Sequence, residues 1–304
     1  MLEQVNTLIS NGMETASYYG LGANIDITHG AHKFQWVVSA IMGLSCIGLY
    51  LMGTRRPAGE RAFHELAAAV CLTACISYYA MAADYGSAPV PVQYIRGGIL
   101  GKKWIKAGVL HPTRSVWYAR YVDWTFTTPL LLLELSLATG LPLAKTFNLL
   151  FLDVLMIVTG LVGALMPDGY KWGFFGFGCF ALVGIWKILL VDGRASVTKL
   201  GSDYSKAYMT STIILSVLWL LYPIAWGLSD GANAITPNSE MVFYGILDVL
   251  AKPVYCFIHV LAIEKLDYSR LGWTSNKRSD GSGASLLGGN RDANYGSTDG
   301  ASRS

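Results

Sequence analysis

Charged residues are scarce in this chain. They make up 14% of its 304 residues, whereas 53% are hydrophobic, and the mean hydropathy is +0.40. Soluble globular domains are about 25% charged, so this composition excludes that class. A helix that crosses a bilayer needs roughly 20 apolar residues, and charge-poor runs of that length lie at about 33–53, 62–85, 115–138, 144–166, 171–191, 207–229 and 239–263. The sequence therefore predicts an all-α, multi-pass integral membrane protein built as a bundle of seven transmembrane helices.

Cysteines are few, and the N-terminal stretch is not expected to be a cleavable leader. The five cysteines (Cys46, Cys71, Cys75, Cys179 and Cys256) all lie within apolar runs, where they are expected to pack rather than to form disulfides or bind metal. The first 30 residues lack the basic start and compact apolar core of a cleavable leader. Neither a metal, a nucleic-acid partner nor an enzymatic activity is expected.

The distribution of basic residues predicts the orientation of the bundle. Lys and Arg gather on one side, in the loop at 55–61, at Lys145, in the loop at 194–206 and after Lys265. Positive residues favour the cytoplasm, so the C-terminus is predicted there and the N-terminus outside. The loop between the second and third runs opposes this trend with Arg96, Lys102, Lys103, Lys106 and Arg114. The predicted organisation is an extracellular tail at 1–30, a helical domain at 31–270 and a disordered polar tail at 271–304.

A lysine lies inside the last apolar run. Lys252 is flanked by uncharged residues and follows Asp248 by four positions, which places both on one helix face. A charge near the bilayer centre costs about 2.5–3.5 kcal/mol even on the insertion scale, which favours a functional role. A structural ion pair is the alternative to Schiff-base chemistry with a carbonyl ligand, for which a desolvated lysine is primed. Pro253 cannot donate to the helix and predicts a bulge that aims the amine.

The third run carries three ionisable residues, Arg120, Asp123 and Glu134. Their spacing predicts a common helix face, with the two carboxyls spread by roughly 16 Å along the axis. That separation excludes a carboxylate pair acting on one bond but suits a proton relay. Arg120 favours an ionised Asp123, and the surrounding leucines favour a neutral Glu134, which suggests an acceptor and a donor. Polar contacts between helices are the alternative.

Aromatic side chains cluster on two of the runs. They are Tyr121 and Trp124 on the third, and Trp219, Tyr222 and Trp226, with Pro223, on the sixth. Such stripes usually serve packing, but beside a buried lysine they favour a slot for a flat apolar ligand. Asp153 is a further intramembrane acid, expected to bond to a neighbouring helix in a structural role.

With these motifs the chain resembles the microbial, type 1 rhodopsins, most closely bacteriorhodopsin and its fungal relatives, over roughly 33–265. The matching pieces are Arg120-Tyr121-Val122-Asp123-Trp124, Thr127-Thr128-Pro129, Leu247-Asp248-Val249-Leu250-Ala251-Lys252, and Trp219 with Tyr222-Pro223 and Trp226. The resemblance implies all-trans retinal bound to Lys252 as a protonated Schiff base, with Asp123 and Asp248 as counterions. In pumping members, light isomerises the retinal, the acid matching Asp123 accepts the Schiff-base proton, and the acid matching Glu134 replaces it.

Further residues carry over singly from the resemblance. Arg120 matches a gate below the Schiff base, and Asp153 matches a buried acid near the retinal ring. Asp230 and Glu240 match an outer pair of proton-releasing acids, although one residue is missing after Trp226, and loop acids are commonly just solvated. The positions that match residues lining or flanking retinal are Tyr78, Tyr121, Trp124, Thr127, Thr128, Met156, Gly160, Trp219, Tyr222 and Pro223.

The chain departs from bacteriorhodopsin at the donor. Glu134 replaces an aspartate, and Ala67 stands where bacteriorhodopsin has a threonine that supports the donor. Loss of that hydroxyl predicts slow reprotonation. Phe174 and Phe175 replace a pair of ring-lining tryptophans, so the colour is not predicted.

The function implied is a light-driven outward proton pump in the plasma membrane. Its partners would be the lipid bilayer, transported H⁺ and other copies of the chain, since oligomers occur in the family. The alternative is a slow-cycling photosensory rhodopsin with little or no transport, which Ala67 favours and the carboxyl of Glu134 disfavours. The leucines around Glu134 disfavour a light-gated channel. The carboxylates of the third run disfavour a G-protein-coupled receptor, and Asp123 disfavours a chloride or sodium pump.

Overall fold

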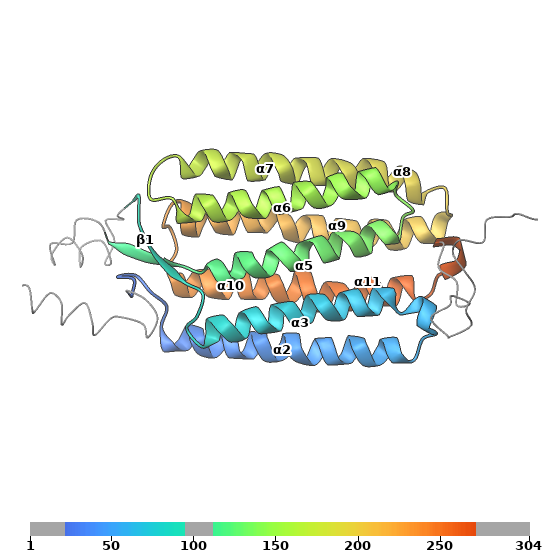
Figure 1. Ribbon diagram of the computed structural model, residues 1–304, viewed down its shortest axis with the longest axis horizontal. Helices are drawn as coiled ribbons and strands as arrows, with labels where there is room; N and C mark the ends of the chain where they lie inside the picture. The colour runs from blue at the N-terminus through green and yellow to red at the C-terminus, as the bar shows by residue number, and fades with distance from the viewer. Residues whose placement is uncertain (1–21, 95–111, 272–304) are drawn as a thin grey trace, which may run out of the picture.

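Seven long helical rods form a bundle in the computed structural model, which describes residues 22–94 and 112–271 (Figure 1). In chain order the rods are α2 (His29–Thr54), α3 (Ala62–Ala82), α5 (Tyr118–Leu137), α6 (Leu143–Leu165), α7 (Lys171–Lys187), α9 (Ser202–Trp226), and α10 (Pro237–Val249) continued by α11 (Tyr255–Ile263). Consecutive rods are neighbours, and α10 closes the ring against α2. The predicted seven-helix fold is confirmed.

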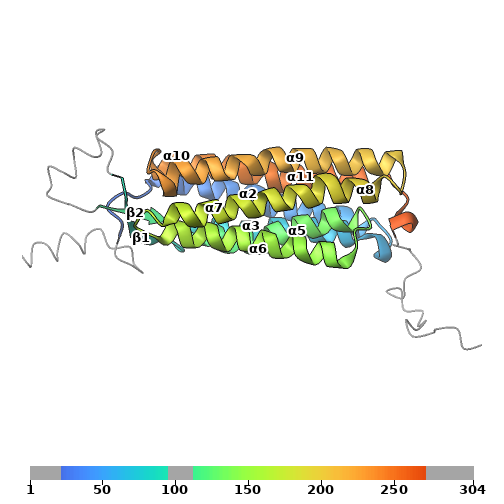
Figure 2. The ribbon, with the colours of Figure 1, turned by 90° about the horizontal axis from the view of Figure 1, so that it is seen from above.

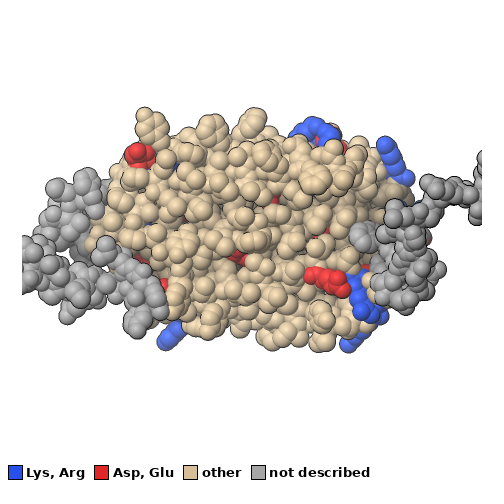
Figure 3. All heavy atoms as spheres, viewed as in Figure 1, with Lys and Arg blue, Asp and Glu red and all other residues tan. Residues whose placement is uncertain are grey.

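The rods place apolar side chains outward and ionisable ones inward. Six of them, among the described residues, are long and apolar enough to cross a membrane. The seventh, α5, contains Arg120, Asp123 and Glu134, whose exposed fractions are only 1%, 2% and 0%. The surface between the two ends of the bundle is almost free of basic residues on the face that Figure 3 shows. Outward side chains such as Leu44 and Phe180 are exposed, as expected for a surface that contacts lipid.

Short π-helical turns occur in three of the rods, within two of them and at the end of the third. They are Ile188–Gly193 between α7 and α8 (Arg194–Val197), Gly227–Gly231 after α9, and Leu250–Val254 between α10 and α11. The last contains Lys252 and Pro253, so the predicted bulge at the lysine is present. A π-turn takes one residue more than an α-turn and is frequent at functional sites.

A β-hairpin caps the end of the bundle at which α2 begins. Strands β1 (Ala88–Pro91) and β2 (Thr113–Val116) pair antiparallel, and Ile25 bridges to Arg114 of β2. The predicted third span, starting at 115, was wrong for its first residues, because β2 continues to Val116 and α5 begins at Tyr118. The apolar content of this stretch fits both a strand and the first turn of a helix, and the pairing with β1 makes it a strand.

The first and last described residues lie at opposite ends of the bundle, as an odd number of spans requires (Figures 1 and 2). Tight 3₁₀ turns at Ala58–Glu60 and Tyr268–Leu271 lie at the end opposite the hairpin. Residues 1–21 and 272–304 lie outside the described residues, and so do Arg96, Lys102, Lys103 and Lys106. Most of the two predicted tails and most of the opposing basic loop therefore lie outside the described residues. The predicted boundary of the first tail at residue 30 was slightly late, because α2 already begins at His29.

Candidate functional site

An ion-pair cluster around Lys252 lies at the core of the bundle. The Lys252 side chain is buried, with 1% of its surface exposed, and its Nζ donates to Asp123 Oδ2 on α5. The same Nζ lies 3.2 Å from Oδ1 of Asp248, one turn earlier on its own rod. A buried amine is tolerated only when it is paired, and here two carboxylates pair with it. The predicted partner Asp248 is present, and Asp123 joins it from a distant part of the sequence.

Asp248 is held by three further donors. Its Oδ2 accepts from the Tyr78 hydroxyl at 2.6 Å, and its Oδ1 accepts from Tyr222 at 2.7 Å and from Trp124 Nε1 at 3.3 Å. These donors come from α3, α9 and α5, so Asp248 ties four rods together. Protonating this carboxylate would weaken several charge-assisted hydrogen bonds at once.

Asp123 is held much less firmly. Lys252 donates to its Oδ2, and among the described residues its Oδ1 has no hydrogen-bond partner. The nearby Thr127 hydroxyl donates to the backbone oxygen of Asp123 rather than to its carboxylate. The free oxygen of Asp123 can therefore take up a proton without breaking an existing bond.

An apolar cavity adjoins the amine of Lys252. The space between its walls amounts to about 770 Å³, part of it open to the outside. Lys252 is the single charged residue among the described residues that line it, and Phe175 stacks on Trp226 in the wall at a centroid distance of 4.8 Å. The predicted residues that line it are Tyr121, Trp124, Thr128, Met156, Gly160, Trp219, Tyr222 and Pro223. A flat apolar molecule joined to an amine fits this lining.

Thr128 connects the cavity wall to Asp153. Its hydroxyl donates to Asp153 Oδ2 at 2.8 Å and also to the backbone oxygen of Trp124. Asp153 is fully buried on α6, so the expected bond to a neighbouring helix is present. The contact fixes α5 against α6 beside the cavity.

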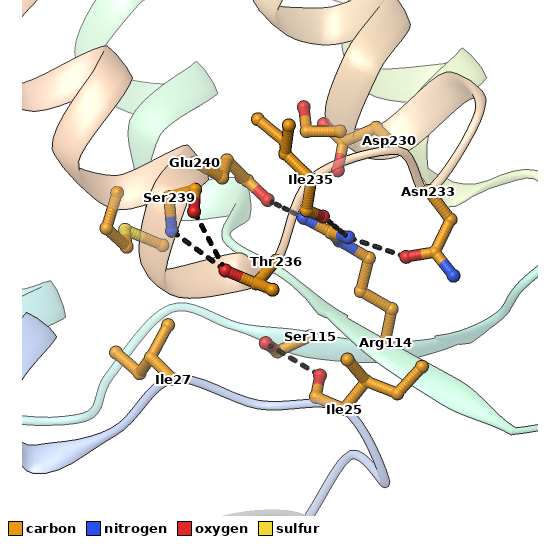
Figure 4. Close-up of polar contacts among 12 residues, drawn as sticks. Ile25, Ile27, Arg114, Ser115, Asp230, Asn233, Ile235, Thr236, Ser239 and Glu240 are labelled. Atoms are coloured by element: carbon orange, nitrogen blue, oxygen red, sulfur yellow. Dashed lines mark hydrogen bonds and ion pairs between the residues drawn. The ribbon is translucent and has the colours of Figure 1, made fainter. Parts of the chain in front are cut away.

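A second charge cluster lies where the hairpin meets the start of α10, and Figure 4 shows Arg114 of β2 reaching Glu240 there. Glu240, fully buried, accepts from Arg114 Nη2 at 2.6 Å and from Arg120 Nη1 at 2.8 Å. Thr236 caps α10 by accepting from the backbone N–H of Ser239, which places Glu240 in the first turn of the helix. Arg120 was expected beside Asp123, but its hydrogen bonds run to Glu240 and to the sulfur of Met241.

Asp230 lies in the same region and is bonded differently. Its Oδ2 accepts from the Tyr121 hydroxyl at 2.8 Å, while its Oδ1 has no hydrogen-bond partner among the described residues. Lys171 Nζ donates to the backbone oxygen of Asp230 rather than to its carboxylate. Asp230 and Lys171 line a small cavity that also touches the hairpin. Asp230 thus keeps an oxygen free within the described part of the chain, whereas both oxygens of Glu240 are bonded.

Glu134 lies on α5 towards the opposite end of the bundle. It is fully buried, and neither carboxyl oxygen has a hydrogen-bond partner among the described residues. Leu131, Leu132 and Leu135 are buried around it, as the sequence predicted. Across the bundle, Nε2 of His259 on α11 lies 4.0 Å from Glu134 Oε1.

Comparisons with known proteins show the family to which this bundle belongs. Residues 29–266 match the sequence profile of the family described as bacteriorhodopsin-like protein. The chain belongs to the bacteriorhodopsin-like family. It is an integral, multi-pass membrane protein. Opsin-like protein carO of Fusarium fujikuroi is 40% identical over 253 residues, which cover 83% of this chain and 80% of the relative.

Among the solved structures that share this fold are two that are described as light-driven proton pumps. The light-driven proton pump rhodopsin CsR of Coccomyxa subellipsoidea aligns with a TM-score of 0.71 and 33% identity over 78% of this chain and 98% of that chain. The light-driven proton pump LR (Mac) of Leptosphaeria maculans aligns with a TM-score of 0.72 and 31% identity over 80% of this chain and 100% of that chain. The described bundle therefore spans nearly the whole of both bacteriorhodopsin-like structures.

Several functional contacts in this bacteriorhodopsin-like chain were not predicted from the sequence. Tyr78 and Thr127, expected to line or flank the ligand, contact Asp248 and the backbone of Asp123 instead of lining the cavity. Arg114 was taken for a loop residue, and its role in holding Glu240 was missed. His259 was also missed, although a histidine seven positions after Lys252 is a signal that could have been used.

Proposed function

We propose that the chain is a light-driven outward proton pump with all-trans retinal joined to Lys252 as a protonated Schiff base. The observation that carries the proposal is the contact between Lys252 Nζ and Asp123, combined with a second buried carboxyl, Glu134, farther along the same helix. Bound retinal supplies light absorption and an isomerisation. The residues described above supply the proton acceptor, the donor and the exit path.

The acceptor in this proposal is Asp123 rather than Asp248. Both carboxylates contact Lys252, but Asp248 is occupied by three other donors, whereas Asp123 Oδ1 is free of any partner in the described part of the chain. A proton that leaves the Lys252 nitrogen meets less resistance at Asp123, because no further hydrogen bond must be lost there. Asp248 keeps its charge and holds the amine in place.

The donor in this proposal is Glu134. Its surroundings are apolar and it lacks hydrogen bonds to the described residues, so it resides there at low cost only as a neutral acid. It can then hold a proton until the Lys252 nitrogen requires one. Outward release would pass Arg120 and reach Asp230, whose free oxygen can hold a proton, while Glu240 stays ionised between two guanidinium groups.

Outward transport requires the hairpin end of the bundle to face the exterior. Figure 3 shows more basic side chains at the other end of the bundle. Arg55 and Arg56 follow the last residue of α2, Lys145 lies in the first turn of α6, Lys187 ends α7 and Arg194 begins α8. This is the distribution expected for the cytoplasmic side. The N-terminal tail at 1–30 would then be extracellular and the tail at 271–304 cytoplasmic, flanking the helical domain at 31–270. Glu134 lies on the cytoplasmic side of Lys252 in this orientation.

A slow photosensory rhodopsin is the second candidate. Ala67 is fully buried in the same apolar core as the leucines around Glu134 and offers no hydroxyl. Without that hydroxyl the return of the proton would be slow, and a long-lived excited form suits signalling. The carboxyl at Glu134 and the similarity to two proton pumps favour transport.

Light-driven acidification distinguishes the two functions. Cells that express the chain with added all-trans retinal are illuminated in weakly buffered medium, with and without a protonophore. The proposal predicts acidification of the medium that the protonophore abolishes. A bleachable chromophore without a pH change would instead assign the chain to the sensor class.

A further inference from the structure

His259 and Glu134 face each other as unpartnered polar groups in the apolar half of the bundle. Both side chains are fully buried. Neither Glu134 oxygen nor His259 Nε2 has a hydrogen-bond partner among the described residues, and Nε2 lies 4.0 Å from Oε1. A buried polar group without a partner costs about 1–3 kcal/mol. A small rotation or one bridging water closes a 4.0 Å gap, so each group is available as the other's partner.

The imidazole of His259 is fixed by its other contacts. Nδ1 lies 2.8 Å from the hydroxyl of Ser211 on α9. The ring of Tyr255 stacks on it at 5.7 Å with an interplanar angle of 8°, and Phe63 of α3 packs against it edge-on. A ring held through Nδ1 presents Nε2 in one direction, and that direction is towards Glu134. The partner of one ring nitrogen also sets the protonation of the other.

Resting on the function proposed above, we propose that His259 passes protons to Glu134 from the cytoplasmic side. In the resting state Nδ1–H is donated to Ser211 Oγ, which leaves Nε2 as an acceptor. When Glu134 has given up its proton, Nε2 takes one proton from the cytoplasmic side and forms an imidazolium. That proton then moves from Nε2 to Oε1 of the Glu134 carboxylate, and His259 returns to its starting neutral form.

The surroundings of Glu134 leave few other groups for this step. Asp123, the other carboxyl of α5, is bonded to Lys252. Histidine is the side chain whose unperturbed proton affinity suits transfer near neutral pH. His259 also supplies a polar group close to the donor, where Ala67 supplies none. The other titratable side chains that interact with Glu134 within the described ranges are phenols and thiols, which are uncharged when protonated: Tyr255, Tyr268, Cys71 and Cys256.

The test compares His259→Gln with His64→Gln in the full chain reconstituted with all-trans retinal in lipid vesicles. His64 is a matched control, because it is also fully buried with both ring nitrogens unpartnered among the described residues, but it packs on α2 at Gly53. After a flash, the rate at which the Lys252 nitrogen regains its proton is followed by visible absorption. We expect His259→Gln to slow this recovery roughly 10-fold or more, azide to restore it, and His64→Gln to leave it unchanged.

A second readout needs no retinal. In retinal-free protein with ¹⁵N-labelled histidine, the Nε2 resonance assigned to His259 should shift in Glu134→Gln, because the two groups interact. Ser211→Ala should change the ratio of the two neutral ring forms of His259. The Ser211→Ala variant tests only how the ring is held, whereas a His259 that does not interact with Glu134 would keep the same Nε2 resonance in Glu134→Gln.

The outcomes separate this inference from the proposed function. Wild-type-like recovery in His259→Gln together with normal wild-type acidification would overturn the role of His259 and leave the pump intact. Absence of wild-type acidification would overturn the pump, while slowed recovery in His259→Gln would still support the proton transfer to Glu134. An Nε2 resonance that does not respond to Glu134→Gln would also overturn the inference.

Discussion

At the scale of single residues, three carboxyl groups of the site differ through their surroundings. Asp248 accepts from three donors besides the amine, Asp123 keeps one oxygen free, and Glu134 has no hydrogen bond among the described residues. Hydrogen bonds to the charged form favour that form, and burial without them favours the neutral acid. The same functional group can therefore serve as fixed counterion, acceptor and donor.

Lys252 carries the first prediction at this scale. Lys252→Ala should abolish the visible absorption band, because the amine that would bind retinal is removed. It also leaves Asp123 and Asp248 without their cation, so Lys252→Arg is the companion variant: it keeps the charge and cannot form the linkage. Absorption spectra of purified protein with added retinal check both. Lys187→Ala, at an exposed lysine, is the control and should keep the band.

An unchanged visible band in both Lys252 variants would mean that retinal binds elsewhere or without a covalent link. A band lost in Lys252→Ala but kept in Lys252→Arg would contradict the Schiff base specifically.

Only some of these residues could be predicted from the sequence. Asp248 and Lys252 are four positions apart on one helix, so their pairing follows from helical spacing. The contacts of Arg114 with Glu240 and of Glu134 with His259 join distant positions. These contacts depend on how the helices are oriented relative to one another. Neither the composition nor the hydrophobic periodicity of the sequence gives that orientation. The contact of Arg120 could not be predicted for the same reason, because its guanidinium pairs with Glu240 from another helix.

At the scale of elements, irregular backbone brings the functional side chains into place. The π-turn at Leu250–Val254 carries Lys252, and the hairpin carries Arg114 over the end of the bundle. Pro253 made the first feature predictable. The hairpin was missed because β1 and β2 are separated by a long loop, and a strand without a near partner cannot be distinguished from a helix start by its apolar residues alone.

The prediction at this scale concerns the contribution of Arg114 to stability. Its guanidinium binds Glu240, Asn233 Oδ1 and the backbone oxygen of Ile235, and so joins β2 to the start of α10. Arg114→Gln should therefore destabilise the protein by about 3–5 kcal/mol, the usual cost of breaking a buried ion pair. The melting temperature of the retinal-bound protein, followed by loss of its visible band, measures the effect. Arg194→Gln, at an exposed position, should change stability by less than about 0.5 kcal/mol.

A melting temperature that is equal in Arg114→Gln and the wild type would show that the hairpin is not fastened through Glu240. Equal losses in the two arginine variants would point to a general effect of charge instead.

At the scale of the whole molecule, a polar column runs inside an apolar shell. From the hairpin end it passes the Arg114, Glu240 and Arg120 cluster, then Lys252 with its two carboxylates, and then Glu134 with His259. The number of helices and their approximate bounds were predictable, because the membrane imposes long charge-free runs. The contacts that join these polar residues from different helices could not be predicted, because they depend on how the helices pack.

The most direct test of the account is the external pH of illuminated cells that express the wild type or Asp123→Asn, each with added all-trans retinal. The substitution removes the negative charge nearest the Lys252 nitrogen while keeping the side-chain shape. We expect a visible band shifted to the red, which shows an intact chromophore, and no acidification. Acidification at the wild-type rate by Asp123→Asn would contradict the account, because the proton would then leave through another carboxyl.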